Sequence, residues 1–247
     1  MFKMMSKTSR LLAISAVMCL AFAGAAQADL LLGWDFTAAG APASTTGNVV
    51  SVNSTTNDTA IQTAPITRGP GAATAVNTFL DLNQGWGAMD GRRRFTSANL
   101  AAAKTAGAYF QWVVAPVSGN IMSLDSLDVV TYQSNVPNVN AGFIEIEYSL
   151  DNFVTAGTTV GTINPVSNMW IGQNTNFSLA GFANLQNTTS TVTFRSYGYG
   201  FPDYHNVGLG QITGNNTDVG VNGTVIPEPA TLGLMAIGGL MMLSRKR

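Results

Sequence analysis

Short segments with the alternation of β-strands recur along the middle of this chain, and turn residues separate them. Val, Ile, Thr and aromatic residues concentrate in the segments, whereas Gly, Asn, Asp and Pro fill the intervals. Helical periodicity is nearly absent, apart from one short helix predicted over residues 97–104, with Ser97 as its N-cap. Many short strands without intervening helices predict an all-β fold, an antiparallel β-sandwich or jelly roll. The predicted strands cover residues 30–36, 47–53, 76–82, 109–115, 124–132, 142–150, 158–163, 175–179, 189–199, 207–213 and 217–225.

Ionised side chains are sparse in residues 29–226 and mostly acidic. Twelve Asp and Glu residues stand against six Lys and Arg residues, which gives a net charge near −6. Nucleic acids require a basic surface, so we exclude them as partners. We predict no metal and no cofactor, because no dense group of ligand residues is present. A structural calcium at Asp125 with Asp128, or at Asp151, is kept as an alternative.

The first 28 residues have the three parts of a secretory signal peptide. An apolar stretch covers residues 11–26, and Ala26 and Ala28 form an A-x-A cleavage site. The mature chain is therefore expected to begin at Asp29. It would contain no cysteine, since the only one, Cys19, lies in the apolar stretch. The basic residues that precede this stretch are Lys3, Lys7 and Arg10.

Residues 227–247 combine a rigid tripeptide, an apolar run over 230–243 and a basic cluster. The prolines Pro227 and Pro229 fix φ and remove backbone donors, so the tripeptide around Glu228 is expected to stay extended. The apolar run can enter a bilayer as a helix of about 21 Å. That length is shorter than the roughly 30 Å hydrocarbon core, so the run suits transient insertion. The basic residues, which prefer the cytoplasmic side as a stop, are Arg245, Lys246 and Arg247.

This tail resembles the PEP-CTERM sorting signal of Gram-negative bacteria, which a membrane-embedded exosortase recognises. The resemblance implies export through the general secretion machinery, a transient stay in the inner membrane and cleavage at Pro227-Glu228-Pro229. It concerns a route of export and implies no activity. The alternative is a tail that is retained as an ordinary single-span anchor.

The middle of the chain is similar to the jelly-roll ectodomain of PEP-CTERM proteins, which is broadly similar to carbohydrate-binding modules. This second resemblance implies the fold only, because a shared fold does not carry function. It divides the chain into a signal peptide (1–28), a β-sandwich ectodomain (29–226) and a sorting signal with a transmembrane helix (227–247). The segments that carry it are residues 109–114, 124–127, 147–153, 192–199 and 222–225.

Two groups of residues were weighed as catalytic machinery. Glu145 and Glu147 share one face of their strand, with Ile144 and Ile146 on the other. Their spacing of about 7 Å is within the range of inverting glycosidases. Two parallel side chains cannot lie on opposite sides of a sugar, so we predict a solvated strand face. The only histidine, His205, could act in a serine triad only beside a nucleophilic serine, and the sequence contains no G-x-S-x-G motif. We therefore predict no catalytic residues.

An aromatic row near residue 200 is the candidate ligand site. Uninterrupted alternation places Tyr197, Tyr199 and Phe201 on the same face as Arg195, where exposed rings could stack on sugars. The alternative is a glycine bulge at Gly198 that sends the tyrosines into the core. The tryptophans are expected in the core, Trp112 above all, because its strand is strongly apolar.

The sequence as a whole predicts an exported, non-enzymatic protein of the cell surface or the extracellular matrix. The resemblance to PEP-CTERM proteins implies as partners the exosortase, the secretion machinery, the inner membrane and an extracellular polysaccharide of a biofilm. Two other classes stay open. One is a secreted carbohydrate-active enzyme, and the other is a permanently anchored structural ectodomain.

Overall fold

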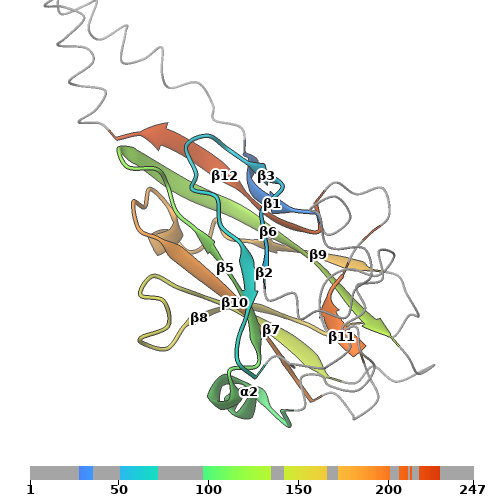
Figure 1. Ribbon diagram of the computed structural model, residues 1–247. Coiled ribbons are helices and arrows are strands. Elements are labelled where there is room, and N and C mark those ends of the chain that lie inside the picture. Colours follow the sequence, from blue (N-terminus) through green and yellow to red (C-terminus); the bar gives the residue numbers. More distant parts are fainter. Residues whose placement is uncertain are drawn as a thin grey trace, which may run out of the picture.

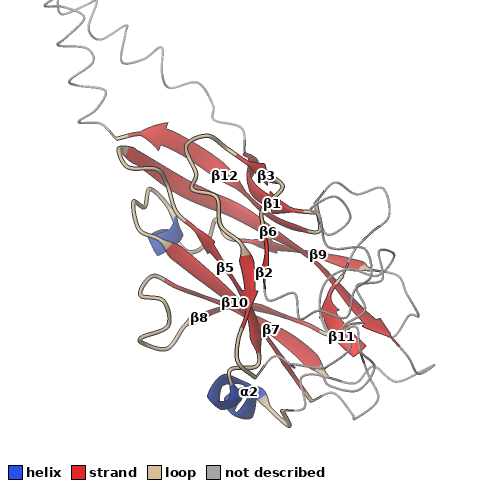
Figure 2. Cartoon of the chain, in the orientation of Figure 1, coloured by secondary structure: helices blue, strands red, loops and turns tan. Residues whose placement is uncertain are grey.

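Two antiparallel β-sheets dominate the described part of the chain in the computed structural model (Figures 1 and 2). The structure describes residues 28–35, 51–71, 97–134, 142–165, 172–200, 206–210, 212 and 217–228. Each sheet has six strands, and one hydrophobic core contains side chains from both. The prediction of a β-sandwich is therefore confirmed.

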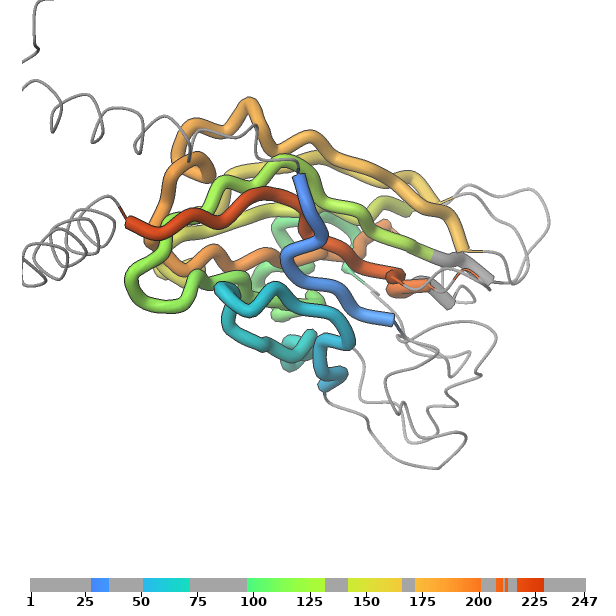
Figure 3. The backbone as a smooth tube through the Cα atoms, turned by 90° about the horizontal axis from the view of Figure 1, so that it is seen from above, coloured from blue at the N-terminus to red at the C-terminus, as the bar shows by residue number. Residues whose placement is uncertain are grey.

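The first sheet is built around β6, a strand of 15 residues. Its order is β11-β6-β12-β1-β3. Strand β9 lies outside this order and also pairs with β6, through residues 126–131. Seen from above, β12 runs beside β6 along most of its length (Figure 3). The strands of this sheet are β1 (Asp29–Trp34), β3 (Thr56–Asn57), β6 (Asn120–Ser134), β9 (Gln173–Ser178), β11 (Asn206–Leu209) and β12 (Val219–Pro227).

The second sheet has the order β2-β4-β5-β10-β7-β8. After β5, the chain passes repeatedly between the sheets: β6 and β9 join the first, whereas β7, β8 and β10 join the second. The strands of the second sheet are β2 (Ser51–Val52), β4 (Ile66–Arg68), β5 (Tyr109–Val114), β7 (Phe143–Ser149), β8 (Thr158–Ile163) and β10 (Val192–Tyr199). The bounds of β8 are those that the sequence predicts.

The core lies between the sheets and is centred on large aromatic residues. Trp112 and Phe194, on neighbouring strands, are fully buried and stack with ring centroids 5.8 Å apart and an interplanar angle of 14°. Trp34 reaches the core from β1, and its Nε1 donates to the carbonyl of Ala64 at 3.1 Å. The predicted core position of Trp112 is confirmed. Alternation along β10 turns Phe194 inward and Arg195 outward.

The described residues also contain two short helices: α2 (Leu100–Ala106) and the 3₁₀ helix η1 (Ala183–Leu185). The N-cap of α2 is Asn99, whose Oδ1 accepts from the amide of Ala102 at 2.9 Å. The predicted cap at Ser97 is therefore wrong by two residues. The helix ends at Gly107, which adopts the left-handed conformation with φ of 68°.

Several predictions fall outside the described residues or differ from them. Strands β3 and β4 lie outside the predicted strands, and β6 extends beyond the predicted 124–132 at both ends. The predicted strand 76–82 is outside the described part. The same holds for residues 1–27 of the expected signal peptide and for the apolar run 230–243. Among the described residues, no helix is long and apolar enough to cross a membrane.

Candidate functional site

The outward face of the second sheet gathers charged and polar side chains from three adjacent strands. On β10, Arg195 lies between Gln111 of β5 and Glu147 of β7. The next outward residue, Tyr197, pairs with Glu145. Alternation thus places both glutamates on one face, as the sequence predicts, and brings them beside a cation that is distant in sequence.

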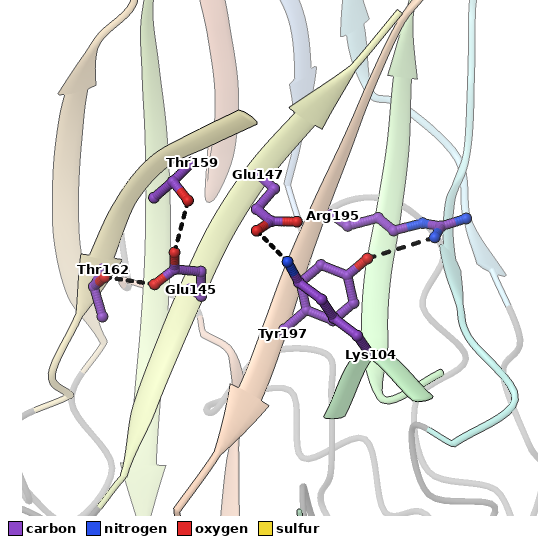
Figure 4. Close-up of polar contacts among 7 residues, drawn as sticks. All are labelled: Lys104, Glu145, Glu147, Thr159, Thr162, Arg195 and Tyr197. Carbon is purple, nitrogen blue, oxygen red and sulfur yellow. Dashed lines mark hydrogen bonds and ion pairs between the residues drawn. The ribbon is translucent and has the colours of Figure 1, made fainter. Parts of the chain in front are cut away.

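Helix α2 covers this face and contributes a second cation (Figure 4). Lys104 Nζ lies 2.5 Å from Glu147 Oε1, and the exposed fractions of the two side chains are 37% and 3%. The second oxygen of Glu147, Oε2, is buried without a hydrogen-bond partner. We call this group the outer-face cluster; it consists of Lys104, Glu145, Glu147, Arg195 and Tyr197.

The expectation of a solvated face for Glu145 and Glu147 is wrong, because both residues are buried. Alternation decides only which way a side chain points; the helix and a loop that cover the face come from other parts of the chain. A buried carboxylate without a partner would be costly, and each glutamate has one. Glu145 accepts from Thr159 Oγ1 at 2.9 Å and from Thr162 Oγ1 at 2.6 Å (Figure 4).

Arg195 is held between two aromatic rings. Its guanidinium carbon lies 4.1 Å from the ring centroid of Tyr109 and 4.2 Å from that of Phe153. Its Nε donates to Gln111 Oε1 at 2.8 Å, and Nη1 donates to the Tyr197 hydroxyl at 3.5 Å. A planar guanidinium suits this environment, since it can stack on both faces while its edge donates hydrogen bonds.

The loop after β7 places Phe153 over Arg195. Ser149 Oγ donates to Asp151 Oδ1 at 2.6 Å and accepts from the amide of Phe153 at 2.8 Å. Thr155 donates to Asp151 Oδ2 through both its hydroxyl and its amide. The hydrogen bond from Ser149, together with those from Thr155, lowers the pKa of Asp151 to about 2. Phe153 has a φ of 62°, a conformation that costs about 1–2 kcal/mol for a residue with a side chain. Its contact with Arg195 and the loop hydrogen bonds offset that cost.

The predicted aromatic platform is not an exposed surface in the described residues. Tyr197 and Tyr199 do follow the phase of Arg195, without a bulge at Gly198. Tyr197 is nevertheless only 3% exposed, because α2 and Phe153 lie over it. Tyr199 is half-buried against Phe143, with ring centroids 5.7 Å apart. Phe201 and His205 lie outside the described residues.

Because Tyr197 is buried, we expect the free energy of unfolding to fall at alkaline pH. Burial raises the pKa of its phenol above the usual value of about 10, so the folded state retains the proton more strongly than the unfolded state. This stabilisation is complete below the unfolded pKa and is lost as pH rises through the folded pKa. Urea unfolding at about pH 9 and about pH 11 is expected to show a smaller loss of stability in Tyr197→Phe than in the wild type. Equal losses would contradict the prediction.

Two of the three acidic residues kept as calcium ligands, Asp128 and Asp151, accept hydrogen bonds through their carboxylates. Asp128 accepts from Asn176 Nδ2 and from Asn222 Nδ2, both at 2.8 Å, on the outward face of the first sheet. Asp151 belongs to the loop after β7, and the carbonyl of Asp125 accepts from the amide of Leu179 at 2.8 Å. Within the described ranges, no three His, Cys, Asp or Glu residues are grouped as they would be around a metal ion.

The first two residues of the Pro227-Glu228-Pro229 tripeptide belong to the folded domain. Pro227 is the last residue of β12 and pairs with Asn120. The amide of Glu228 donates to the carbonyl of Gly119 at 2.9 Å, and Glu228 is half-buried. Glu228 also lines a hollow of about 300 Å³ at this end of the sandwich. The other lining residues include the turn 116–120, Gln62, Thr189 and Thr191.

Comparison of the sequence with known protein families and with curated proteins gave no significant match. The sequence alone did not reveal Lys104 as a member of the outer-face cluster, nor Gln111 and Phe153 as contacts of Arg195. Charge pattern offered one signal, since Lys104 and Arg195 are the only basic residues between 95 and 244. Two isolated cations in an acidic domain are candidates for partners of buried carboxylates.

Proposed function

We propose that this chain is an exported protein whose tail is a sorting signal for an exosortase of the PEP-CTERM type. The observation that carries the proposal is the order of features in residues 227–247: the Pro-Glu-Pro tripeptide, the apolar run and the basic cluster. The described domain supports it, since β12 leads directly into the tripeptide. The tail would therefore begin where the folded domain ends.

The finer architecture belongs to the same proposal. We infer a jelly-roll-like arrangement of the sandwich, supported by the repeated passage of the chain between the two sheets after β5. Ala26 and Ala28 would mark removal of a signal peptide, so that β1 starts at the first mature residue, Asp29. Residues 230–243 would form the transmembrane helix, with Arg245, Lys246 and Arg247 on its cytoplasmic side.

We place the mature domain at the cell surface or in an extracellular polysaccharide matrix, in a binding or structural role. The outer-face cluster supports a role without catalysis, because its carboxylates are engaged with Lys104, Thr159 and Thr162. Glu145 and Glu147 lie on one strand and on one side of it, and this arrangement does not place two acids across a bound sugar. A glycan surface, if the domain has one, would have to use residues other than Tyr197.

The proposal is tested by the intact mass of the mature protein from its native host, measured in each cell fraction. The expected result is an extracellular species whose mass corresponds to a chain from Asp29 to about Pro229. Glu228→Ala is expected to abolish this species. Thr191→Ala is the matched control, because Thr191 lines the same hollow and lies outside the tripeptide. A wild-type mass that retains Arg247 in the membrane fraction would overturn the proposal and favour a permanently anchored ectodomain.

A further inference from the structure

The sorting tripeptide is partly enclosed by the domain that it follows. Four residues of β12, Thr224 to Pro227, pair with Ser123 to Asn120 of β6, and the amide of Glu228 extends this ladder to Gly119. The Glu228 residue itself is half-buried at the hollow. A peptidase binds its substrate through the same backbone groups and side chains. The ladder and the peptidase therefore compete for one segment.

The fold also marks where this segment can separate. In the described residues, β1 pairs with β12 only from Val219 to Gly223, so the residues beyond Gly223 are bonded to β6 on one side. The register of β12 and β6 shifts between Asn222 and Gly223, because Asp125 of β6 is an extra residue there, and such a bulge interrupts the ladder. The paired segment beyond it is also weakly buried, since Ile226 is 45% exposed.

We propose that residues 224–228 leave β6 before the membrane peptidase acts, and that the register shift at Gly223 is the hinge of this opening. This inference rests on the proposed sorting function and adds a conformational step to it. Local openings of this kind are drawn from the least stable parts of a fold. Gly223 suits the bulge, because a Cβ there would lie 2.1 Å from the carbonyl oxygen of Ser123.

The chemical step itself needs only water. Hydrolysis at the tripeptide adds the oxygen of water to the acyl carbon and breaks the C–N bond. The released tail carries the new amine, which takes up the proton. In the closed arrangement, the amide of Glu228 is bonded to Gly119, and Glu228 is one of the residues that line the hollow. The peptidase would reach the tripeptide only after this pairing is lost.

A disulfide between β12 and β6 tests the opening. Ile226 and Ile121 are directly paired, and partners in an antiparallel ladder have Cα separations that suit a disulfide. The mature chain contains no other cysteine, because Cys19 lies in the signal peptide. In the double variant Ile121→Cys with Ile226→Cys, the disulfide locks β12 to β6 two residues before Glu228. Glu228 can then move at most about 7 Å from the disulfide.

The matched control locks the same two strands on the other side of the proposed hinge. Ser126 and Asn222 are also directly paired, and their side chains meet at 3.1 Å. A disulfide at these positions leaves six residues before Glu228, a reach of about 20 Å. The single variant Ile226→Cys controls for any effect of the substitution on recognition of the tripeptide.

The measurement is the rate of tail removal from the full chain in its native host, followed by intact mass. The lock at residues 121 and 226 is expected to slow removal at least about tenfold, and a reductant is expected to restore it. The control lock and the single variant are expected to stay within about twofold of the wild type. If the tail is removed at the wild-type rate while the 121–226 disulfide is formed, the opening step is overturned and the sorting function is not. A wild-type chain that never loses its tail would overturn the sorting function and the inference together.

Discussion

Replacing Trp112 with alanine is expected to lower the free energy of unfolding by about 3–5 kcal/mol. The indole is fully buried in the central part of the second sheet and stacks on Phe194. Its removal would leave a cavity between the sheets, and the neighbouring strands could close it only in part. Urea denaturation followed by circular dichroism measures the change.

Two variants separate the loss of packing from other effects. Trp112→Phe keeps most of the ring and removes Nε1, which is buried without a hydrogen-bond partner, so we expect a loss below about 1.5 kcal/mol. Val113→Ala changes the adjacent residue, which points outward and is half-buried. Its expected loss is about 1 kcal/mol or less. A loss below about 1 kcal/mol for Trp112→Ala would contradict the central position of Trp112 in the core.

Replacing Lys104 with methionine is expected to destabilise the domain by about 2 kcal/mol. The variant keeps the length of the side chain on α2 and leaves Glu147 buried without its ion-pair partner. This figure is lower than the 3–5 kcal/mol typical of fully buried pairs, because Lys104 is more than one-third exposed and solvent screens the pair. Thermal and urea unfolding at neutral pH measure the loss.

The two partners are expected to differ in a double-mutant cycle. Glu147→Gln removes the buried charge and leaves Lys104 able to turn toward water, so we expect a loss of about 1 kcal/mol. The double variant Lys104→Met with Glu147→Gln is expected to be more stable than Lys104→Met alone, because no unpaired charge remains buried. Additive losses would show that the contact in the structure contributes nothing.

The strands of this protein were largely predictable because their signals are local. Alternation over 158–163 predicted β8 with its observed bounds, and the apolar strand around Trp112 predicted a core position. Alternation also placed Glu145 and Glu147 on one face. Each of these predictions depends only on the period of two in a strand and on neighbouring turn residues.

The short elements were harder to predict for the same reason. Strand β4 has three residues, and it is defined by pairing with β5 rather than by its own pattern. The cap of α2 could be assigned to Ser97 or to Asn99 on composition alone, since both residue types cap helices. The structure selects Asn99, because only the packing of the helix determines where its first turn begins.

The sequence alone determined the class of fold, the outward direction of Glu145, Glu147, Arg195 and Tyr197, and the order of features in the tail. Only the tertiary structure decided that this outward face is covered, and that Pro227 and Glu228 belong to the ladder with β6. The physical reason is the range of the interactions. The direction of a side chain follows from backbone geometry over two residues, whereas its burial depends on elements that lie far away in sequence. Lys104 is 43 residues from Glu147, and no local pattern records that they meet.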